Sequence, residues 1–273
     1  MSRAVVLKTL RDALPLVVVL TFATVGLEMA IVRMLREIGG DVEQLRRWLE
    51  LPLIRDLLRI AMGADILGDL TPTTMATFGL GHPLLYAFAW TLLLTIGSGV
   101  IAGEIDRGTA DLLLTLPVSR AQIYVSTSVA WVVAAVLVSF APMLGLWLGE
   151  RLCPLHEPLA LRRLWPLAVN FLALNLSVGA VTMLVSSLVS RRGTAVGILL
   201  AGLLASDLMN FLSQFWESVR PFSFLGFLHY YRLLPVVRSG EFPAGDIAVL
   251  LAIGLGAWSA GLWHFGRRDI PAA

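Results

Sequence analysis

The sequence predicts an all-α polytopic membrane protein, and the composition, the low charge and the long apolar segments are the observations behind this fold class. Of the 273 residues, 57% are hydrophobic and 15% are charged, and the mean hydropathy is +0.80. Soluble domains have about 45–50% apolar and about 25% charged residues. The composition therefore excludes an ordinary soluble enzyme and a disordered chain, and the net charge of +2 is too small for a nucleic-acid surface.

Six segments are long and apolar enough to cross a bilayer, which requires ~20 mainly apolar residues for ~30 Å of hydrocarbon. The predicted spans cover residues 13–32, 83–102, 121–148, 165–189, 194–212 and 247–265. The third span is long enough to tilt in the membrane or to project from it. An even number of spans places both termini on one side, and residues 1–273 are predicted to form a single transmembrane domain.

The segment before the first span, residues 1–11, mixes apolar residues with Arg3, Lys8 and Arg11. This pattern favours an amphipathic helix that lies in the membrane interface and leads into the span. The apolar stretch that follows is too long for the short core of a cleavable signal peptide.

The longest connection, residues 34–81, is predicted to form helices on the extracytoplasmic side. Asp41 and Gln44 are spaced as a capping box, and apolar residues follow at helical spacing. Pro52 is expected to end that helix before a second short one begins. Residues 213–245 are rich in aromatic side chains and broken by prolines, which favours an interfacial or re-entrant hairpin.

The number of basic residues on each side does not by itself fix the orientation. Nine Lys and Arg residues lie on the side of the termini and 12 on the other, where six belong to the long segment after the first span or its edge. Basic residues next to span ends count most, and long loops count little. Arg191–Arg192 and Arg267–Arg268 adjoin span ends, which favours the side of the termini as cytoplasmic.

The connection between the second and third spans has the pattern of a short amphipathic helix at the cytoplasmic surface. Gly108 permits a turn, Thr109 can cap a helix, and Pro117 stops it. Ser119 and Gln122 then form a capping box at the start of the third span. A helix with one apolar and one charged face, held between two spans, suits a groove on a partner protein.

Residues 103–120 follow the pattern G-E-x-x-x-G-T-x-x-x-L-L-x-x-P-x-S-R, which resembles the permease subunits of type-2 ABC exporters. The turn at residues 190–192 and the ending at residues 261–270 are similar to that family, and the resemblance covers essentially the whole chain. One subgroup that the chain resembles contains the permeases of multi-copper-enzyme maturation. The chain lacks a ladder of Met, His and Cys residues for copper, so that substrate is not carried over.

The resemblance implies a channel of two permease subunits, the second being a copy or a paralogue, with two copies of an ABC ATP-binding subunit docked beneath. Residues 104–117 would form the coupling helix that sits in the ATPase groove, and residues 1–11 an elbow helix. ATP and magnesium would bind to the partner subunit. The resemblance also implies cytoplasmic termini in the inner membrane of a bacterium or archaeon. The residues expected to couple to the ATPase are Glu104, Arg107, Gly108, Thr109, Asp111, Leu112, Leu113, Pro117 and Arg120.

Two acids lie well inside predicted spans, Glu28 in the first and Asp207 in the fifth. Ionisable groups at such positions are energetically expensive and often functional. They are expected either to face the transport pathway or to pair with Arg33 and Arg220 as locks at an interface.

Small residues recur every four positions in the fifth span and at the end of the second, a spacing that lets helices approach closely. Packing within one subunit is the favoured interpretation, and a seam between two subunits is the alternative. These residues are Gly99, Gly103, Gly193, Gly197, Ala201 and Ala205.

The sequence gives no pattern for ATP, metal or another cofactor on this chain. A P-loop needs a lysine after a glycine-rich turn, and the only lysine, Lys8, follows Val6 and Leu7. The single cysteine, Cys153, excludes an intrachain disulfide and a multi-cysteine metal site, and the four histidines lack the spacing of ligands.

Two other functions compete with a non-enzymatic transport subunit. An ATP-independent channel or secondary transporter is expected to show internal repeats with broken helices, and no convincing repeat is found. An intramembrane protease is suggested by Ser98, which lies between two glycines, but a serine nucleophile needs a base within hydrogen-bond reach. His264 lies near the cytoplasmic end of the last span. The transport subunit is favoured, with the lipid membrane and an ATPase as partners and no nucleic acid.

Overall fold

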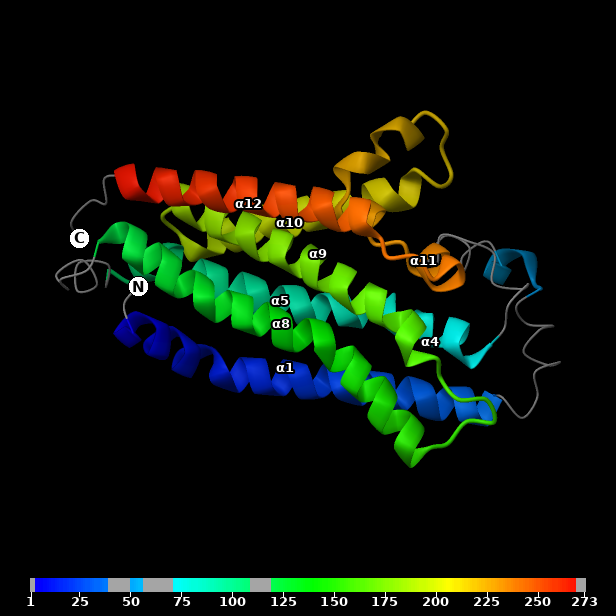
Figure 1. Cartoon of the computed structure of the whole chain (residues 1–273). Coiled ribbons are helices and arrows are strands. Elements are labelled where there is room, and N and C mark those ends of the chain that lie inside the picture. Colours follow the sequence, from blue (N-terminus) through cyan, green and yellow to red (C-terminus); the bar gives the residue numbers. More distant parts are fainter. Residues whose placement is uncertain (1–2, 39–49, 56–70, 109–118, 269–273) are drawn as a thin grey trace.

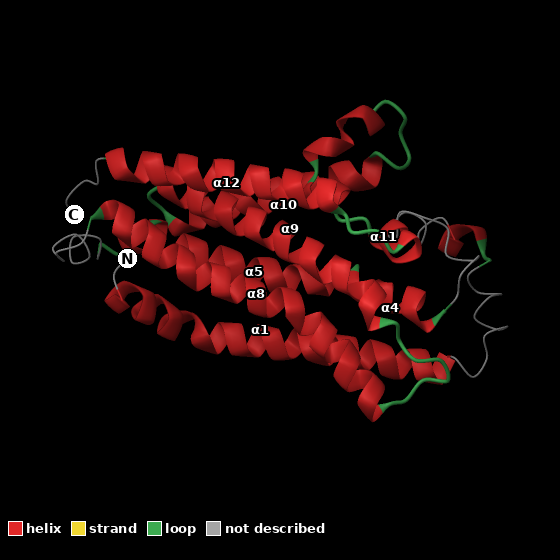
Figure 2. Cartoon of the chain, in the orientation of Figure 1, coloured by secondary structure: helices red, strands yellow, loops and turns green. Residues whose placement is uncertain are grey.

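A computed structural model describes residues 3–38, 50–55, 71–108 and 119–268, and every regular element in these ranges is helical (Figures 1 and 2). The all-α fold class is therefore confirmed. The elements are α1 (Arg3–Ile38), α4 (Pro72–Leu80), α5 (Pro83–Val100), α6 (Ala102–Asp106), α8 (Arg120–Leu152), α9 (Leu161–Leu188), α10 (Arg192–Leu212), the 3-10 helices η1 (Arg220–Leu225) and η2 (Phe227–Tyr230), α11 (Leu233–Ser239) and α12 (Ala244–Arg267).

Six helical segments of the described chain are long and apolar enough to span a membrane, as the sequence predicts. They correspond to α1, to α4 and α5 together, and to α8, α9, α10 and α12. Several of these helices extend past the predicted bounds, because a helix continues beyond the hydrocarbon wherever polar side chains can reach water. The predicted capping box at the start of α8 is present, since Ser119 and Gln122 each accept a hydrogen bond from the other's backbone N–H.

The start of the chain differs from the prediction. We expect a separate interfacial helix over residues 1–11, but α1 is continuous from Arg3 and passes through Pro15 without a break. Proline at this position removes one backbone hydrogen bond and does not end the helix. The basic residues of the predicted elbow therefore occupy the first turns of α1.

The connections at the opposite end are partly helical. Pro52 begins a helical turn over residues 52–55, as suits a residue whose missing N–H is not needed in a first turn. Residues 41–49 of the helix predicted before it lie outside the described residues. Thr71 caps α4 by accepting from the N–H of Thr74. The predicted capping box at Asp41 and Gln44 lies outside the described residues. The aromatic segment after α10 folds into η1, η2 and α11, and Figure 1 shows η1 and η2 projecting from the side of the bundle.

The long helices lie roughly along one direction, with α9 between the α1–α8 pair and α12 (Figure 1). The first turn of α1 and the last turn of α12 lie at the same end of the bundle, which we call the terminal end. Helices α4 and α11 lie at the other end, which we call the far end. Both α6 and the turn between α9 and α10 belong to the terminal end.

Helices α1 and α8 approach so closely that glycine is required between them. A Cβ atom added at Gly145 would lie 2.6 Å from the backbone oxygen of Val25 and 2.7 Å from the Cβ of Glu28. One turn later, a Cβ atom at Gly149 would lie 2.9 Å from the Cβ of Val32. Small residues four positions apart allow such contact between membrane helices.

Polar side chains join the helices inside the bundle. Trp258 on α12 donates its indole N–H to the Ser128 hydroxyl on α8 at 2.8 Å, and the Tyr124 hydroxyl donates to the backbone oxygen of Trp258 at 3.2 Å. Asn175 on α9 donates to the Ser139 hydroxyl on α8 at 2.9 Å. Hydrogen bonds of this kind supplement packing where lipid removes the hydrophobic force between helices.

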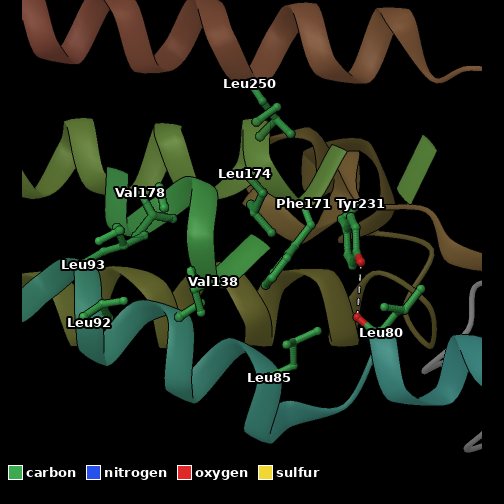
Figure 3. Close-up of a cluster of buried hydrophobic side chains, with 14 of the residues drawn as sticks. Leu80, Leu85, Leu92, Leu93, Val138, Phe171, Leu174, Val178, Tyr231 and Leu250 are labelled. Atoms are coloured by element: carbon green, nitrogen blue, oxygen red, sulfur yellow. Dashed lines mark hydrogen bonds between the residues drawn. The ribbon is translucent and has the colours of Figure 1, made fainter. Parts of the chain in front are cut away.

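Buried apolar side chains from α4, α5, α8, α9 and α12 form a continuous cluster around α9 (Figure 3). Phe171 and Leu174 lie at its centre with 1% or less of their surface exposed. Tyr231, which follows η2, closes the cluster at the far end and donates its hydroxyl to the backbone oxygen of Leu80 at 3.3 Å.

The α1–α8 contact predicts a difference between two glycine substitutions. We expect Gly145→Ala to destabilise the protein by about 1–3 kcal/mol, because the methyl group overlaps the α1 backbone. Gly256→Ala on α12, where no atom lies within 4 Å of the added Cβ, keeps or raises stability through helix propensity. Thermal unfolding in detergent checks the pair, and equal effects would refute the close approach.

Candidate functional site

The terminal end collects three groups of charged side chains around α6 and the α9–α10 turn. α6 starts directly after α5, where the backbone N–H of Ala102 donates to the Ser186 hydroxyl of α9 at 3.1 Å. Gly108 then turns the chain with a φ of 67°, a left-handed conformation that favours glycine. The turn predicted at Gly108 is thus present. It lies within residues 104–117, the predicted coupling helix, of which residues 109–117 lie outside the described residues.

Glu104 links α6 to the start of α1. Its carboxylate accepts from the Lys8 ammonium at 3.2 Å and from the Arg107 guanidinium at 2.9 Å. The Glu104 side chain is only 13% exposed, while those of Lys8 and Arg107 are more than half exposed. Water therefore screens the cations more than the carboxylate. Glu104 is placed as a bridge within the chain, and not as a freely exposed contact for a partner.

Arg192 links the start of α10 to α5 and α6. Its guanidinium donates to the Ser98 hydroxyl and to the backbone oxygen of Thr95, both at 3.4 Å. Its backbone N–H donates to the Asp106 carboxylate at 3.4 Å. A Cβ atom at Gly103 would lie 3.5 Å from the Cδ of Arg192, so the stem of this arginine packs over the glycine. The hydroxyl of Ser98 is thus engaged by an arginine, and the geometry offers no support for a protease nucleophile.

Arg268 links the end of α12 to the end of α9. Its guanidinium donates to the backbone oxygens of Ser187 at 2.7 Å and Val189 at 2.9 Å, and to the Ser190 hydroxyl. Arg120, the first residue of α8, donates to the backbone oxygen of Arg268. A cation at a helix C-terminus satisfies carbonyls that have no partner in the helix. Burial lowers the pKa of Arg268, from a value so alkaline that the group stays charged at neutral pH.

The residues predicted to couple to an ATPase fall into two sets. Glu104, Arg107, Gly108 and Arg120 lie in the described part of the chain, at the terminal end, and their role stays a prediction. The others lie outside the described residues, namely Thr109, Asp111, Leu112, Leu113 and Pro117.

The two predicted interior acids occupy different environments. Glu28 is fully buried, and no hydrogen-bond partner reaches either carboxylate oxygen. Its predicted pairing with Arg33 is wrong, because Arg33 bonds to Glu37 one turn along α1 at 3.2 Å. Asp207 lies on the exposed side of α10, and the described residues give it no ion pair with Arg220.

The small residues of α10 face away from the rest of the chain. A Cβ atom added at Gly193 or Gly197 meets no other atom within 4 Å, and the same holds for Gly99 on α5. Ala201 and Ala205 are exposed too. Packing within one subunit is therefore wrong for these positions, whereas Gly103 does pack inside the chain. Only 17% of the α10 span window is buried, against 67% for α9.

Sequence reasoning missed three residues that organise the terminal end, Lys8, Arg192 and Arg268. In the sequence they indicate an interfacial helix, the orientation of the chain and the lack of a P-loop, but no contact between helices. A signal exists for Lys8, because it is the only lysine in a chain whose other basic residues are arginines. No sequence signal pairs it with Glu104, since the two residues are 96 positions apart.

A family model described as ABC-2 family transporter protein matches residues 6–217, which is more than half of the chain. No curated protein matches the chain. The matched range starts in the first turns of α1 and includes α6, Gly108 and the α9–α10 turn.

The two arginines at the end of α12 provide a matched pair for a stability test. We expect Arg268→Gln to lower the free energy of unfolding by on the order of 1.5–3 kcal/mol, because it removes charged hydrogen bonds to α9. Arg267→Gln removes only a cation–π contact with Trp263, at 4.4 Å from the ring centroid, and is expected to cost less than about 1 kcal/mol. Thermal melts of both variants check this, and a larger loss in the Arg267 variant would contradict it.

Proposed function

Because the chain belongs to the ABC-2 family of transporter proteins, we propose that it is the permease subunit of an ATP-driven exporter. The membership makes it a multi-pass membrane component that works with an ABC ATP-binding subunit. Export, the location in the inner membrane of a bacterium or archaeon with cytoplasmic termini, and the binding of ATP and magnesium to the partner are parts of the proposal. So is the likeness to permeases of multi-copper-enzyme maturation.

The observation that carries the proposal is the set of charged links at the terminal end. Glu104 ties α6 to α1 through Lys8, and Asp106 ties α6 to α10 through Arg192. A partner that pushes on the segment after Gly108 would therefore move the starts of two spanning helices together. α10 is poorly buried in this chain, so its displacement disturbs little of the central core.

A channel or secondary transporter that works without ATP is the alternative function. Such a protein has no need for a docking helix between its second and third spans. The presence or absence of a bound ATP-binding subunit therefore decides between the two functions.

The partner is also expected to include a second permease, and we propose a second copy of this chain. The open face of α10 supports it, because small residues at Gly193, Gly197 and Ala201 would let two α10 helices meet closely. Asp207 on the same helix would then leave the lipid for a protein interface or for water between the two copies.

Replacing Leu112 with Asp tests the docking helix. A charge at an apolar anchor is expected to cost about 2 kcal/mol or more, which exceeds a tenfold loss of affinity. Purification of the tagged chain in mild detergent, with quantification of the co-purifying ATP-binding subunit, measures the loss. Glu241→Gln at the far end is the control and should keep the subunit bound. A wild-type chain that brings down no ATP-binding subunit would favour the channel.

Disulfide trapping tests the second copy. In a Cys153→Ser background, we expect Ala201→Cys to form a cross-linked dimer on mild oxidation in the membrane, because the α10 faces meet. Ala252→Cys on the exposed side of α12 is the matched control and should stay monomeric. Non-reducing electrophoresis separates the products. A cross-link in the Ala252→Cys variant alone would place the interface on α12 and not on α10. No cross-link in either variant would refute the pairing through α10.

A further inference from the structure

Glu28 is a buried acid that the coupling site does not use. It lies in α1 with 0% of its surface exposed, and no donor reaches Oε1 or Oε2. An unpaired charge is expensive inside a protein or a membrane and is avoided unless a partner compensates it. At this position, no hydrogen-bond donor stabilises the ionised form of the Glu28 side chain.

Two glycines shape the space around this side chain. A Cβ atom added at Gly79 of α4 would collide with the carboxyl atoms of Glu28. A Cβ atom at Gly145 of α8 would lie 2.7 Å from the Cβ of Glu28. The carboxyl group is thus held against the α4 backbone, and the start of its side chain against α8. Helix α4 covers the group from the far end.

No cation in the described residues faces the Glu28 carboxyl group. On α1 itself, Arg33 is bonded to Glu37 and is exposed. On α8, Glu150 accepts from the backbone of Leu159, and Arg151 lies over the Trp147 ring. Described α4 contains no ionisable side chain.

Tyr86 and Tyr231 are the tyrosines of the buried cluster near this site. Burial raises the pKa of Tyr231 well above its ordinary value, so its hydroxyl stays neutral. That hydroxyl donates to the backbone oxygen of Leu80 at the end of α4 and not to the carboxyl group. Neither tyrosine supplies a positive charge to Glu28.

From this geometry we propose that Glu28 binds a single proton and keeps it while α4 covers the site. A protonated carboxyl group is neutral and carries an O–H donor, so it needs no cation beside it. An ionised group would be strongly destabilised at this place by the loss of its hydration. Release of the proton to water therefore requires α4 to move away from α1.

The far-end contacts of α4 determine how that movement is restrained. Its last residue, Leu80, accepts from Tyr231, and its Thr73 hydroxyl accepts from the backbone N–H of Ala160 before α9. The helix that covers protonated Glu28 is thus hydrogen-bonded to Tyr231, after η2, and to Ala160, before α9. Proton occupancy and the arrangement of the far end are linked, because either one constrains the other.

Infrared spectroscopy of the purified full chain in lipid nanodiscs tests the proton directly. At neutral pH, the difference between wild type and Glu28→Gln is expected to show the loss of the carbonyl stretch of one protonated carboxyl group. Loss of carboxylate bands instead would overturn the proposal. Asp207→Asn, at the exposed acid of α10, is the control and should leave the Glu28 band in place. If the Gln variant does not fold, Glu28→Asp shifts the same band.

Deuterium exchange of the carbonyl band of Glu28 tests whether α4 shields the carboxyl group from water. Tyr231→Phe removes the hydrogen bond from the tyrosine hydroxyl to the backbone oxygen of Leu80. In this variant, we expect the Glu28 carboxyl band to shift in D2O sooner than in wild type. An exchange rate equal to wild type would show that α4 does not seal the site. Both measurements use the chain without an ATP-binding subunit, so their outcome is independent of the coupling proposal.

Discussion

The close contact between α1 and α8 at Gly145 is the interaction on which the arrangement of the bundle depends. Lipid is as apolar as the interior of a helix bundle, so burial of apolar area gives membrane helices little reason to associate. Backbone approach and hydrogen bonds must supply the difference. At Gly145 the two backbones touch, and this contact fixes the rotation of α1 that turns Glu28 inward. A rotation of α1 toward lipid would expose that acid to hydrocarbon.

The polar links at the terminal end divide the molecule into a central part and two outer helices. α8, α9 and α12 are joined at that end by Arg120 and Arg268, in addition to the buried hydrogen bonds along their length. α1 and α10 are attached there through α6, by Lys8 and Arg192. The Lys8–Glu104 ion pair is exposed on the lysine side, and the Arg192–Asp106 link is a hydrogen bond from the backbone N–H, so each contributes only about 0–1.5 kcal/mol. They can therefore be broken and remade without unfolding the core.

Hydrophobicity alone located all six spans, because a helix that crosses a membrane must satisfy its backbone internally and present apolar side chains over its whole length. Local chemistry predicted the capping box at Ser119 and the turn at Gly108, since both depend on residues close in sequence.

The same information could not show which side of a span meets protein. In α10 the packed face at Leu199 and Leu203 is as apolar as the open face. The sequence therefore could not show that the small residues of α10 lie on the open face and not on the packed one. The prediction of a separate elbow helix is wrong for a related reason, because an amphipathic segment can form either the end of a long helix or a helix of its own. The pairing of Lys8 with Glu104 depends on the whole fold.

The open face of α10 has a consequence for how cells handle newly made chains. In a single copy, Asp207 lies on a helix surface that lipid would cover, and an ionised acid that faces hydrocarbon is unfavourable. Its aromatic segment at η1 also projects with Phe222 and Phe224 half exposed. A newly made copy in lipid therefore carries an unfavourable helix face and an exposed aromatic segment together, which disfavours its accumulation as a single chain.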